Sequence, residues 1–172
     1  MLFYLNESFN TKQVIGPKSN IWTEPEILQL ATQDFEATDA ILKIAEKILG
    51  DYIWGFLDFL VTPDHPYGGM ENPHLITIDQ KAVTGDKSVE ELIAHEIVHQ
   101  WFGNIVTYVN MEHLWINEGF TSFLTKKVMG RLYGEPFRHF LGIRGWRSLD
   151  HIINEKKNPL SRLVNNNTLK GR

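Results

Sequence analysis

The sequence has no cysteine among its 172 residues. This absence excludes disulfides and thiolate zinc sites, so histidine and carboxylate are the only strong side-chain ligands for a transition metal. The sequence also lacks an apolar run close to the roughly 20 residues that a membrane-spanning helix needs. Residues 1–5 are too few for the apolar region of a secretion signal and have no basic start. We therefore expect a cytoplasmic protein.

A strong charge of either sign is missing as well. The formal net charge of −4 gives no electrostatic footprint for nucleic acid or for an anionic membrane, and we expect neither as a partner. Hydrophobic residues make up 42% of the chain, which is enough for a buried core. The length leaves room for about one domain.

The motif HEIVH at positions 95–99 places two imidazoles four residues apart, with a carboxylate directly after the first. On a helix these two positions share one face, so His95 and His99 can bind one zinc ion. Glu96 then lies beside the metal, where it can take a proton from a bound water. The alternative is a pair of polar positions on an ordinary amphipathic helix. Apolar residues at 92, 93, 97 and 98 favour the metal, because buried imidazoles need partners.

A third ligand is available in the segment NEG at 117–119, after 18 intervening residues. That spacing is long enough to finish one helix, turn, and bring Glu118 in on a second helix. Two histidines and one glutamate leave the fourth tetrahedral position open for water, which is typical of catalytic rather than structural zinc.

A second motif, GGMEN at 68–72, ends a loop and precedes an apolar run. Paired glycines let the backbone approach another chain closely. A carboxylate at the mouth of a zinc site can pair with the ammonium group of a peptide's N-terminus, which would make the protein an exopeptidase. The alternative is a simple turn before an edge strand, with Glu71 in solvent.

Three segments together resemble the zinc aminopeptidases of the gluzincin type. They are PYGGMENP (66–73), GDKSVEELIAHEIVHQWFGNIVT (85–107) and HLWINEGFTSFL (113–124). Within that family they are most similar to the leukotriene A-4 hydrolase/aminopeptidase branch, as are IGPKSNIWTE (15–24) and GRLYGEPFRHF (130–140). The resemblance spans about residues 13–163.

The resemblance implies a role for each matching residue at the metal. His95, His99 and Glu118 would bind one Zn²⁺ per chain. Glu96 would be the general base that polarises the attacking water and later delivers its proton to the leaving amine. The implied activity is hydrolysis of the N-terminal peptide bond of peptides.

The resemblance also implies how the substrate binds. Glu71 would bind the α-ammonium group of a peptide that has a free N-terminus. Gly68, Gly69, Met70 and Asn72 would line the substrate beside an edge strand, where extended peptide backbone can add to the sheet.

Several departures from the family pattern support an alternative function. The family has several domains, and this chain resembles only the first part of the catalytic domain. The tyrosine that stabilises the oxyanion lies beyond it, and Tyr108 and Tyr133 fall at the wrong places. Thr125 stands where relatives have a glutamate hydrogen-bonded to a ligand histidine. The alternative is a catalytically weak zinc-binding fragment that captures peptide N-termini or docks to a partner, such as the remaining family domains or another subunit.

We therefore expect an α+β fold, part of a thermolysin-like zinc peptidase catalytic domain. A small mixed β-sheet edge would lie beside the helices that carry the zinc site. Residues 1–20 would end an N-terminal β-rich segment or linker, residues 21–164 would form the partial catalytic domain, and residues 165–172 a polar tail.

Local patterns predict the elements that carry the motifs. A capping box, TEPE at 23–26, predicts a helix that starts at Thr23, and Gly50 suits the position after its end. His113 lies near the third ligand, but the metal already has three ligands, and we expect it to be structural. The other predicted elements are helical residues within 27–49, strands at 54–61 and 75–78, a zinc helix from residue 86 or 88 to about 102, and helices at 117–129 and from Pro136.

Overall fold

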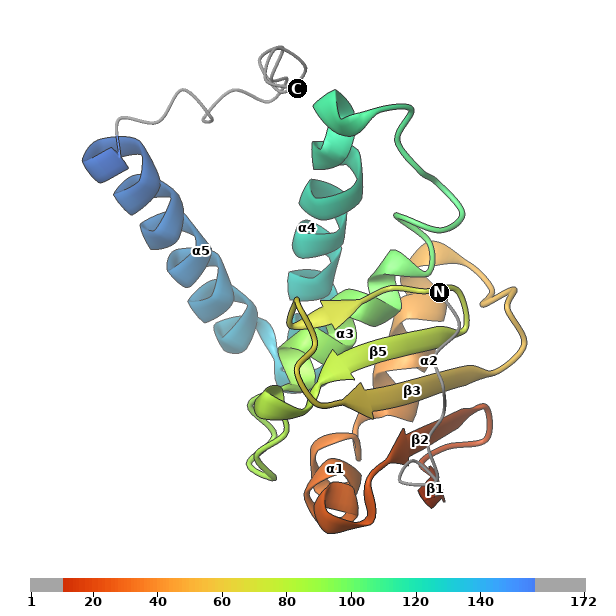
Figure 1. Ribbon diagram of the computed structural model, residues 1–172. Coiled ribbons are helices and arrows are strands. Elements are labelled where there is room, and N and C mark those ends of the chain that lie inside the picture. The colour runs from red at the N-terminus through yellow and green to blue at the C-terminus, as the bar shows by residue number, and fades with distance from the viewer. Residues whose placement is uncertain (1–10, 157–172) are drawn as a thin grey trace, which may run out of the picture.

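A five-stranded mixed sheet forms one layer of the computed structural model, which describes residues 11–156 (Figure 1). The strand order is β1–β2–β3–β5–β4. Strands β2, β3 and β5 are parallel to one another, whereas β1 and β4 pair antiparallel with their neighbours. The strands are β1 (Thr11–Val14), β2 (Ser19–Thr23), β3 (Leu57–Thr62), β4 (Gly69–Met70) and β5 (Leu75–Asp79).

The core lies between this sheet and the helices α2 (Thr38–Leu49) and α3 (Glu90–His99), which lie behind it in Figure 1. β3 is the central strand, and its sequence LDFLVT is almost continuously apolar, as expected for a parallel strand that is covered by helices. Phe59 on β3 is fully buried and packs edge-on against Phe35, with ring centroids 5.0 Å apart.

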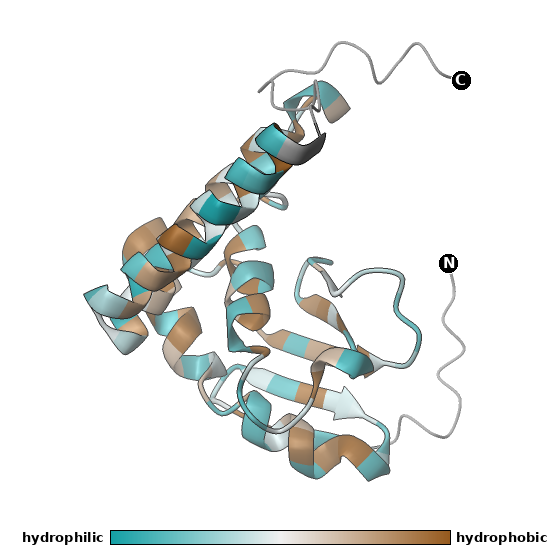
Figure 2. Ribbon diagram, turned by 90° about the vertical axis from the view of Figure 1, so that its left-hand side faces the viewer, coloured by the Kyte–Doolittle hydropathy of each residue, from teal (hydrophilic) through white to brown (hydrophobic). Residues whose placement is uncertain are grey.

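Two long helices complete the described chain. α4 (Leu114–Tyr133) packs against α3 and α2, and α5 (Glu135–Lys156) packs against α4 near the turn between them and then diverges from it (Figure 1). α4 ends where Gly134 takes a φ of 95°, a conformation that favours glycine. Apolar segments recur along α5 in Figure 2. Its exposed apolar residues are Phe140, Ile143, Trp146, Leu149, Ile152 and Ile153.

The fold confirms the expected class, a mixed sheet with helices that carry the HEIVH and NEG motifs. Within residues 11–156, no helix is both long and apolar enough to cross a membrane. The cytoplasmic location stays a prediction.

The predicted capping box is wrong. Thr23 is the last residue of β2, where it pairs with Thr11 of β1. A short 3-10 helix, η2 (Pro25–Ile27), follows, and no side chain caps it. Strand pairing with β1 therefore places Thr23 in a strand, although the local pattern assigns it to a helix start. The helical region beyond it divides into α1 (Leu28–Asp34) and α2.

Other boundaries shift by a few residues. α3 is shorter than predicted, and α4 begins three residues earlier because a 3-10 turn, η4 (Met111–His113), leads into it. A third 3-10 turn, η3 (Gln80–Ala82), follows β5. The domain boundary expected after residue 20 falls inside β2. Residues 1–10 and the polar tail at 165–172 lie outside the described residues.

Asp34 fixes the loop that leads into the zinc helix. Its side chain is fully buried and accepts hydrogen bonds from three backbone N–H groups. Oδ2 accepts from Thr84 and Gly85, both at 2.9 Å, and Oδ1 accepts from Lys87 at 2.7 Å. Because charge-assisted hydrogen bonds are the strong ones, this carboxylate holds the segment just before α3 against the end of α1.

We expect Asp34→Asn to destabilise the protein by about 2–3 kcal/mol, because the amide presents an NH₂ group to backbone donors and loses the charge. Urea unfolding followed by circular dichroism measures the loss. The matched control is Asp64→Asn. Asp64 is 90% exposed and pairs only with Lys81 on the surface, so its loss should cost less than about 1 kcal/mol. Equal costs for the two variants would contradict the role of Asp34.

Candidate metal centre

Three side chains from α3 and α4 meet at the centre of the candidate site. His95 and His99 lie one turn apart on α3, with their Nε2 atoms 2.9 Å from each other. Oε2 of Glu118, on the second turn of α4, lies 3.4 Å from His95 Nε2 and 3.6 Å from His99 Nε2. Ligand atoms about 2.1 Å from a tetrahedral zinc ion are about 3.4 Å apart, so this donor set fits zinc.

Contacts at Nδ1, on the opposite side of the ring from Glu118, hold the imidazole of His99 in one orientation. Its Nδ1 lies 2.8 Å from the carbonyl oxygen of Phe102 and 3.1 Å from the hydroxyl of Thr121. When the ring is neutral, an N–H at Nδ1 that donates to the carbonyl leaves the Nε2 lone pair available to a metal ion. This is how metal-binding histidines are commonly fixed in the right tautomer.

Hydrogen bonds from the two imidazoles hold the pKa of Glu118 well below its usual range, with His95 the larger contributor. Burial by itself lowers the pKa of His99. Hydrogen bonds to Glu118 and the Phe102 carbonyl outweigh it, together with the nearby charge of Glu71, so that the pKa is raised. The third donor is therefore an ionised carboxylate, as a divalent cation requires.

Glu96 is buried beside this triad, although the residue between two ligands on a helix surface is often exposed. Only 4% of its surface is accessible, and its Oε2 has no hydrogen-bond partner among the described residues. Burial raises its pKa to about 8, and the charges of Glu71 and Glu118 add to this while His99 opposes it. A buried carboxylate without a partner is costly, and a nearby cation or a shared proton removes that cost.

Amide side chains just after α3 and at the start of α4 hold the GGMEN loop in place. The backbone carbonyl of Glu71 accepts hydrogen bonds from Asn104 Nδ2 at 2.7 Å and from Gln100 Nε2 at 3.3 Å. Its carboxylate Oε1 accepts from Asn117 Nδ2 at 3.1 Å and lies 4.0 Å from His99 Nδ1. Glu71, Glu96 and His99 thus form a second group whose ligand atoms lie within 4.8 Å of one another.

The glycines of the loop form an edge of the sheet directly over Glu96. Gly69 and Met70 make up β4, which pairs antiparallel with Ile78 and Thr77 of β5 and is the last strand at that edge. A Cβ built on Gly69 would lie 2.5 Å from Glu96 Oε1. The backbone can therefore pass this close to Glu96 only because residue 69 has no side chain.

The structure brings together the ligands, Glu96 and Glu71 predicted from the sequence. Asn72 differs, because its carbonyl accepts from Leu75 and Gln100 and so closes the turn after the loop. His113 belongs to neither candidate ligand group. The hydroxyl of Thr125 donates to the Thr121 carbonyl at 2.8 Å, within its own helix.

Sequence reasoning missed three supporting residues, Gln100, Asn117 and Thr121. All three are buried polar residues. Gln100 and Asn117 directly neighbour a predicted ligand, and Thr121 lies three residues after Glu118 on the same helix. A polar residue in an apolar stretch beside a ligand was the available signal, but the partners of these three side chains are 19 to 46 residues away in sequence.

The chain as a whole is similar to known proteins. A model of the Peptidase family M1 domain matches residues 33–167. Leukotriene A-4 hydrolase of Xenopus laevis is 45% identical over 155 residues, which cover 88% of this chain and 26% of that protein. Leucine aminopeptidase 2 of Candida glabrata is 41% identical over 156 residues, covering 88% of this chain and 24% of that protein.

The fold is similar to a solved relative as well. Yeast leukotriene A-4 hydrolase in complex with bestatin superposes with a TM-score of 0.84 at 40% identity, over 91% of this chain and 26% of that one. The chain thus spans about a quarter of the length of the relatives it matches.

We expect Gly69→Ala to displace Glu96 or the β4 edge, because the new methyl group would overlap the Glu96 carboxylate. The cost should be about 1–3 kcal/mol in the free energy of unfolding, with weaker zinc binding by chelator competition. Gly68→Ala is the control, since its Cβ would meet only Leu92 at 3.6 Å, an ordinary contact. Similar effects at both positions would contradict the close approach at residue 69.

Proposed function

This chain belongs to peptidase family M1, and on that premise we propose that it carries the zinc site of an aminopeptidase that hydrolyses the N-terminal peptide bond of peptides. The observation that supports this most is the arrangement at α3. Two imidazoles and the ionised Glu118 converge on one point, and the buried Glu96 lies beside them without a hydrogen-bond partner for Oε2 among the described residues.

His95, His99 and Glu118 would hold the zinc ion, which when bound lowers the pKa of a water and polarises the substrate carbonyl. The protein's own step falls to Glu96. Its carboxylate accepts a proton from the attacking water and returns that proton to the leaving amine nitrogen. Burial raises the pKa of this carboxylate, and a bound cation would oppose that rise and favour the ionised form that accepts the proton.

Glu71 would set where the peptide chain begins. Its carboxylate stands over His99, at the end of the β4 edge, and it is held there by Asn117. An ammonium group bound to Glu71 would place the first residue of the peptide beside Glu96, because ligand atoms of the two carboxylates lie within 4.8 Å of each other. An extended peptide can follow the edge of β4, where backbone hydrogen bonds do not depend on sequence. Peptides with a free N-terminus are therefore the proposed substrates.

A second candidate is zinc binding and N-terminus capture with little or no turnover. Tyr108 donates its hydroxyl to Met111 Sδ, and Tyr133 donates to Glu90, so neither supplies an oxyanion donor at the metal. Losing one such donor typically costs about 100- to 1,000-fold in rate. Measured turnover separates this candidate from the enzyme.

We expect the purified chain to bind one zinc ion and Glu96→Gln to keep that stoichiometry while it lowers the turnover of aminoacyl-anilide substrates by about 100- to 10,000-fold. Metal analysis and anilide hydrolysis measure the two properties. Glu26→Gln, an exposed substitution on η2, is the control and should change neither. If one zinc is bound and Glu96→Gln leaves turnover as it was, the enzyme proposal fails for this chain.

Glu71→Gln tests the role of the loop, because the amide keeps an oxygen for Asn117 but loses the charge that pairs with ammonium. We expect the affinity for a peptide with a free N-terminus to fall about tenfold or more, while the affinity for its N-acetylated form stays unchanged. Inhibition constants of matched peptide pairs measure this. An equal loss for both peptides would remove the assigned role.

A further inference from the structure

The two imidazoles of the metal centre differ in how they are held. His99 Nδ1 has two partners, the carbonyl of Phe102 and the hydroxyl of Thr121. Nδ1 of His95 has no hydrogen-bond partner among residues 11–156. The contacts of the His95 side chain run through Nε2 or through the ring. A metal-binding histidine almost always donates its second N–H to a carboxylate, a carbonyl or a water. No residue within 11–156 supplies this hydrogen bond for His95, whose side chain is 23% exposed.

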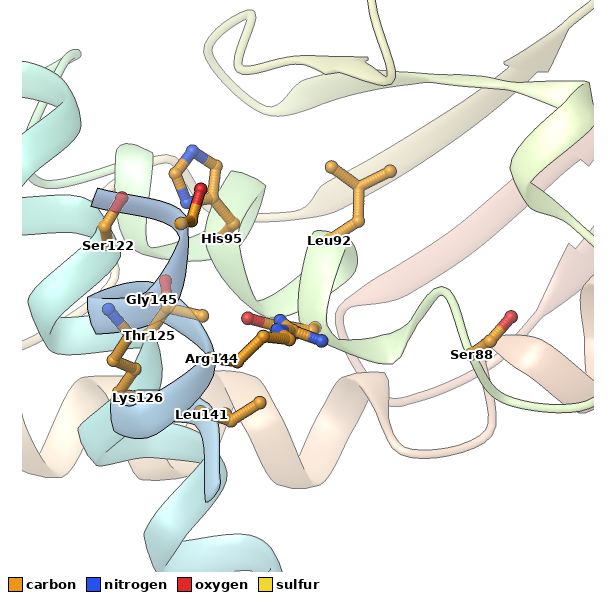
Figure 3. Close-up of a pocket in the computed structure, with 11 residues that line it drawn as sticks. Ser88, Leu92, His95, Ser122, Thr125, Lys126, Leu141, Arg144 and Gly145 are labelled. Carbon is orange, nitrogen blue, oxygen red and sulfur yellow. The ribbon is translucent and has the colours of Figure 1, made fainter. Parts of the chain in front are cut away.

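A cavity lies beside His95. It has a volume of about 690 Å³ and is lined by His95 and by residues of α3, α4 and α5. Figure 3 shows His95 on α3, Ser122, Thr125 and Lys126 on α4, and Arg144 on α5 around this space. The hydroxyl of Thr125 donates to its own helix, so it leaves the space open. The volume is ample for a molecule of three or four heavy atoms.

The lining of this cavity carries a positive charge without a counterion. Lys126 is half-buried and forms no ion pair with any described residue. Arg144 pairs with Glu91 across the cavity, which cancels those two charges. The side chain of Lys126 lies against Gly145 of α5, where a Cβ would come within 3.2 Å of Nζ. The imidazole of His95, the hydroxyl of Ser122 and the ammonium group of Lys126 thus line the same space.

We propose that this cavity binds a small carboxylate from solution, such as formate or acetate, which accepts a hydrogen bond from Nδ1 of His95 and is countered by Lys126. This rests on the zinc site proposed above. The carboxylate stabilises His95 in the tautomer that keeps the Nε2 lone pair for the metal. Binding of zinc and of carboxylate are then coupled, and each raises the affinity for the other by the same factor.

Glu91 offers the competing arrangement. It lies four residues before His95, on the same face of α3, and it lines the same cavity. A rotation of its side chain away from Arg144 could place its carboxylate at Nδ1. The structure favours the pair with Arg144, because the two groups are in direct contact. Substitution of Glu91 separates the two arrangements.

The test measures zinc affinity by competition with a chromophoric chelator, in buffer without carboxylates and then with increasing sodium formate or acetate. Sodium chloride keeps the ionic strength constant. We expect the carboxylate to raise zinc affinity about tenfold and the effect to saturate. Carboxylate that only complexes zinc in solution would lower the apparent affinity instead. Thermal unfolding of each variant checks that it is folded.

Thr125→Glu places a tethered carboxylate in the cavity. We expect it to raise zinc affinity about tenfold in carboxylate-free buffer and to abolish the response to acetate. Thr125→Val keeps the size of threonine, adds no carboxylate, and should keep the response to acetate. Lys126→Met should weaken the response several-fold. Lys127→Met is its matched control, because Lys127 is the next residue on α4 but lies over Phe123 and does not line this cavity.

Each remaining outcome contradicts the proposal in a distinct way. An acetate response that persists in Thr125→Glu would place acetate on the zinc ion itself. No response in the unchanged chain, with weaker zinc binding in Glu91→Gln, would make Glu91 the partner of His95. If zinc binds with an affinity that does not change with carboxylate concentration, this inference fails while the proposed function stands. Failure to bind zinc in any of these buffers overturns the proposed function, and this inference with it.

Discussion

The packing of α4 across α3 is the constraint on which the candidate site depends. Helix geometry alone pairs the two imidazoles, but only this contact brings Glu118 within 3.6 Å of both. The same contact places Thr121 behind His99, so that one face of α4 supplies both a ligand and the hydroxyl that orients another ligand. A change in the angle between these helices would separate the donor atoms. It would also remove the Thr121 hydroxyl that orients His99.

Amide side chains, of which those of Gln100 and Asn117 are buried, connect this centre to the sheet. Gln100, Asn104 and Asn117 all bind Glu71, through its carbonyl or its carboxylate. They fix the loop before β5 to the helix pair, so the edge strand and the metal centre keep one spacing. The glycine at 69 lets that loop lie directly on Glu96. The proposed binding edge, the proposed general base and the candidate ligands therefore form one unit, whose parts come from three separate segments of the chain.

Local pattern predicted the elements well where burial and periodicity agree. The apolar runs that became β3 and β5 and the helical spacing of α2 and α4 are examples, with ends displaced by a few residues. It failed at Thr23, where a good helix-capping sequence lies in a strand that is paired on both sides. Strand partners outside the local motif determined the conformation of Thr23, and a local pattern carries no information about such partners.

The sequence by itself determined the chemistry of the ligands. Four-residue spacing puts His95 and His99 on one helix face, and the lack of cysteine limits the third donor to histidine or a carboxylate, which Glu118 offers after 18 intervening residues. Only the tertiary structure decided that Glu118 reaches them, that Glu96 is buried, and that His95 faces a cavity while His99 is anchored. The physical reason is that distance in space, desolvation and hydrogen-bond partners arise from contacts between segments that are far apart along the chain.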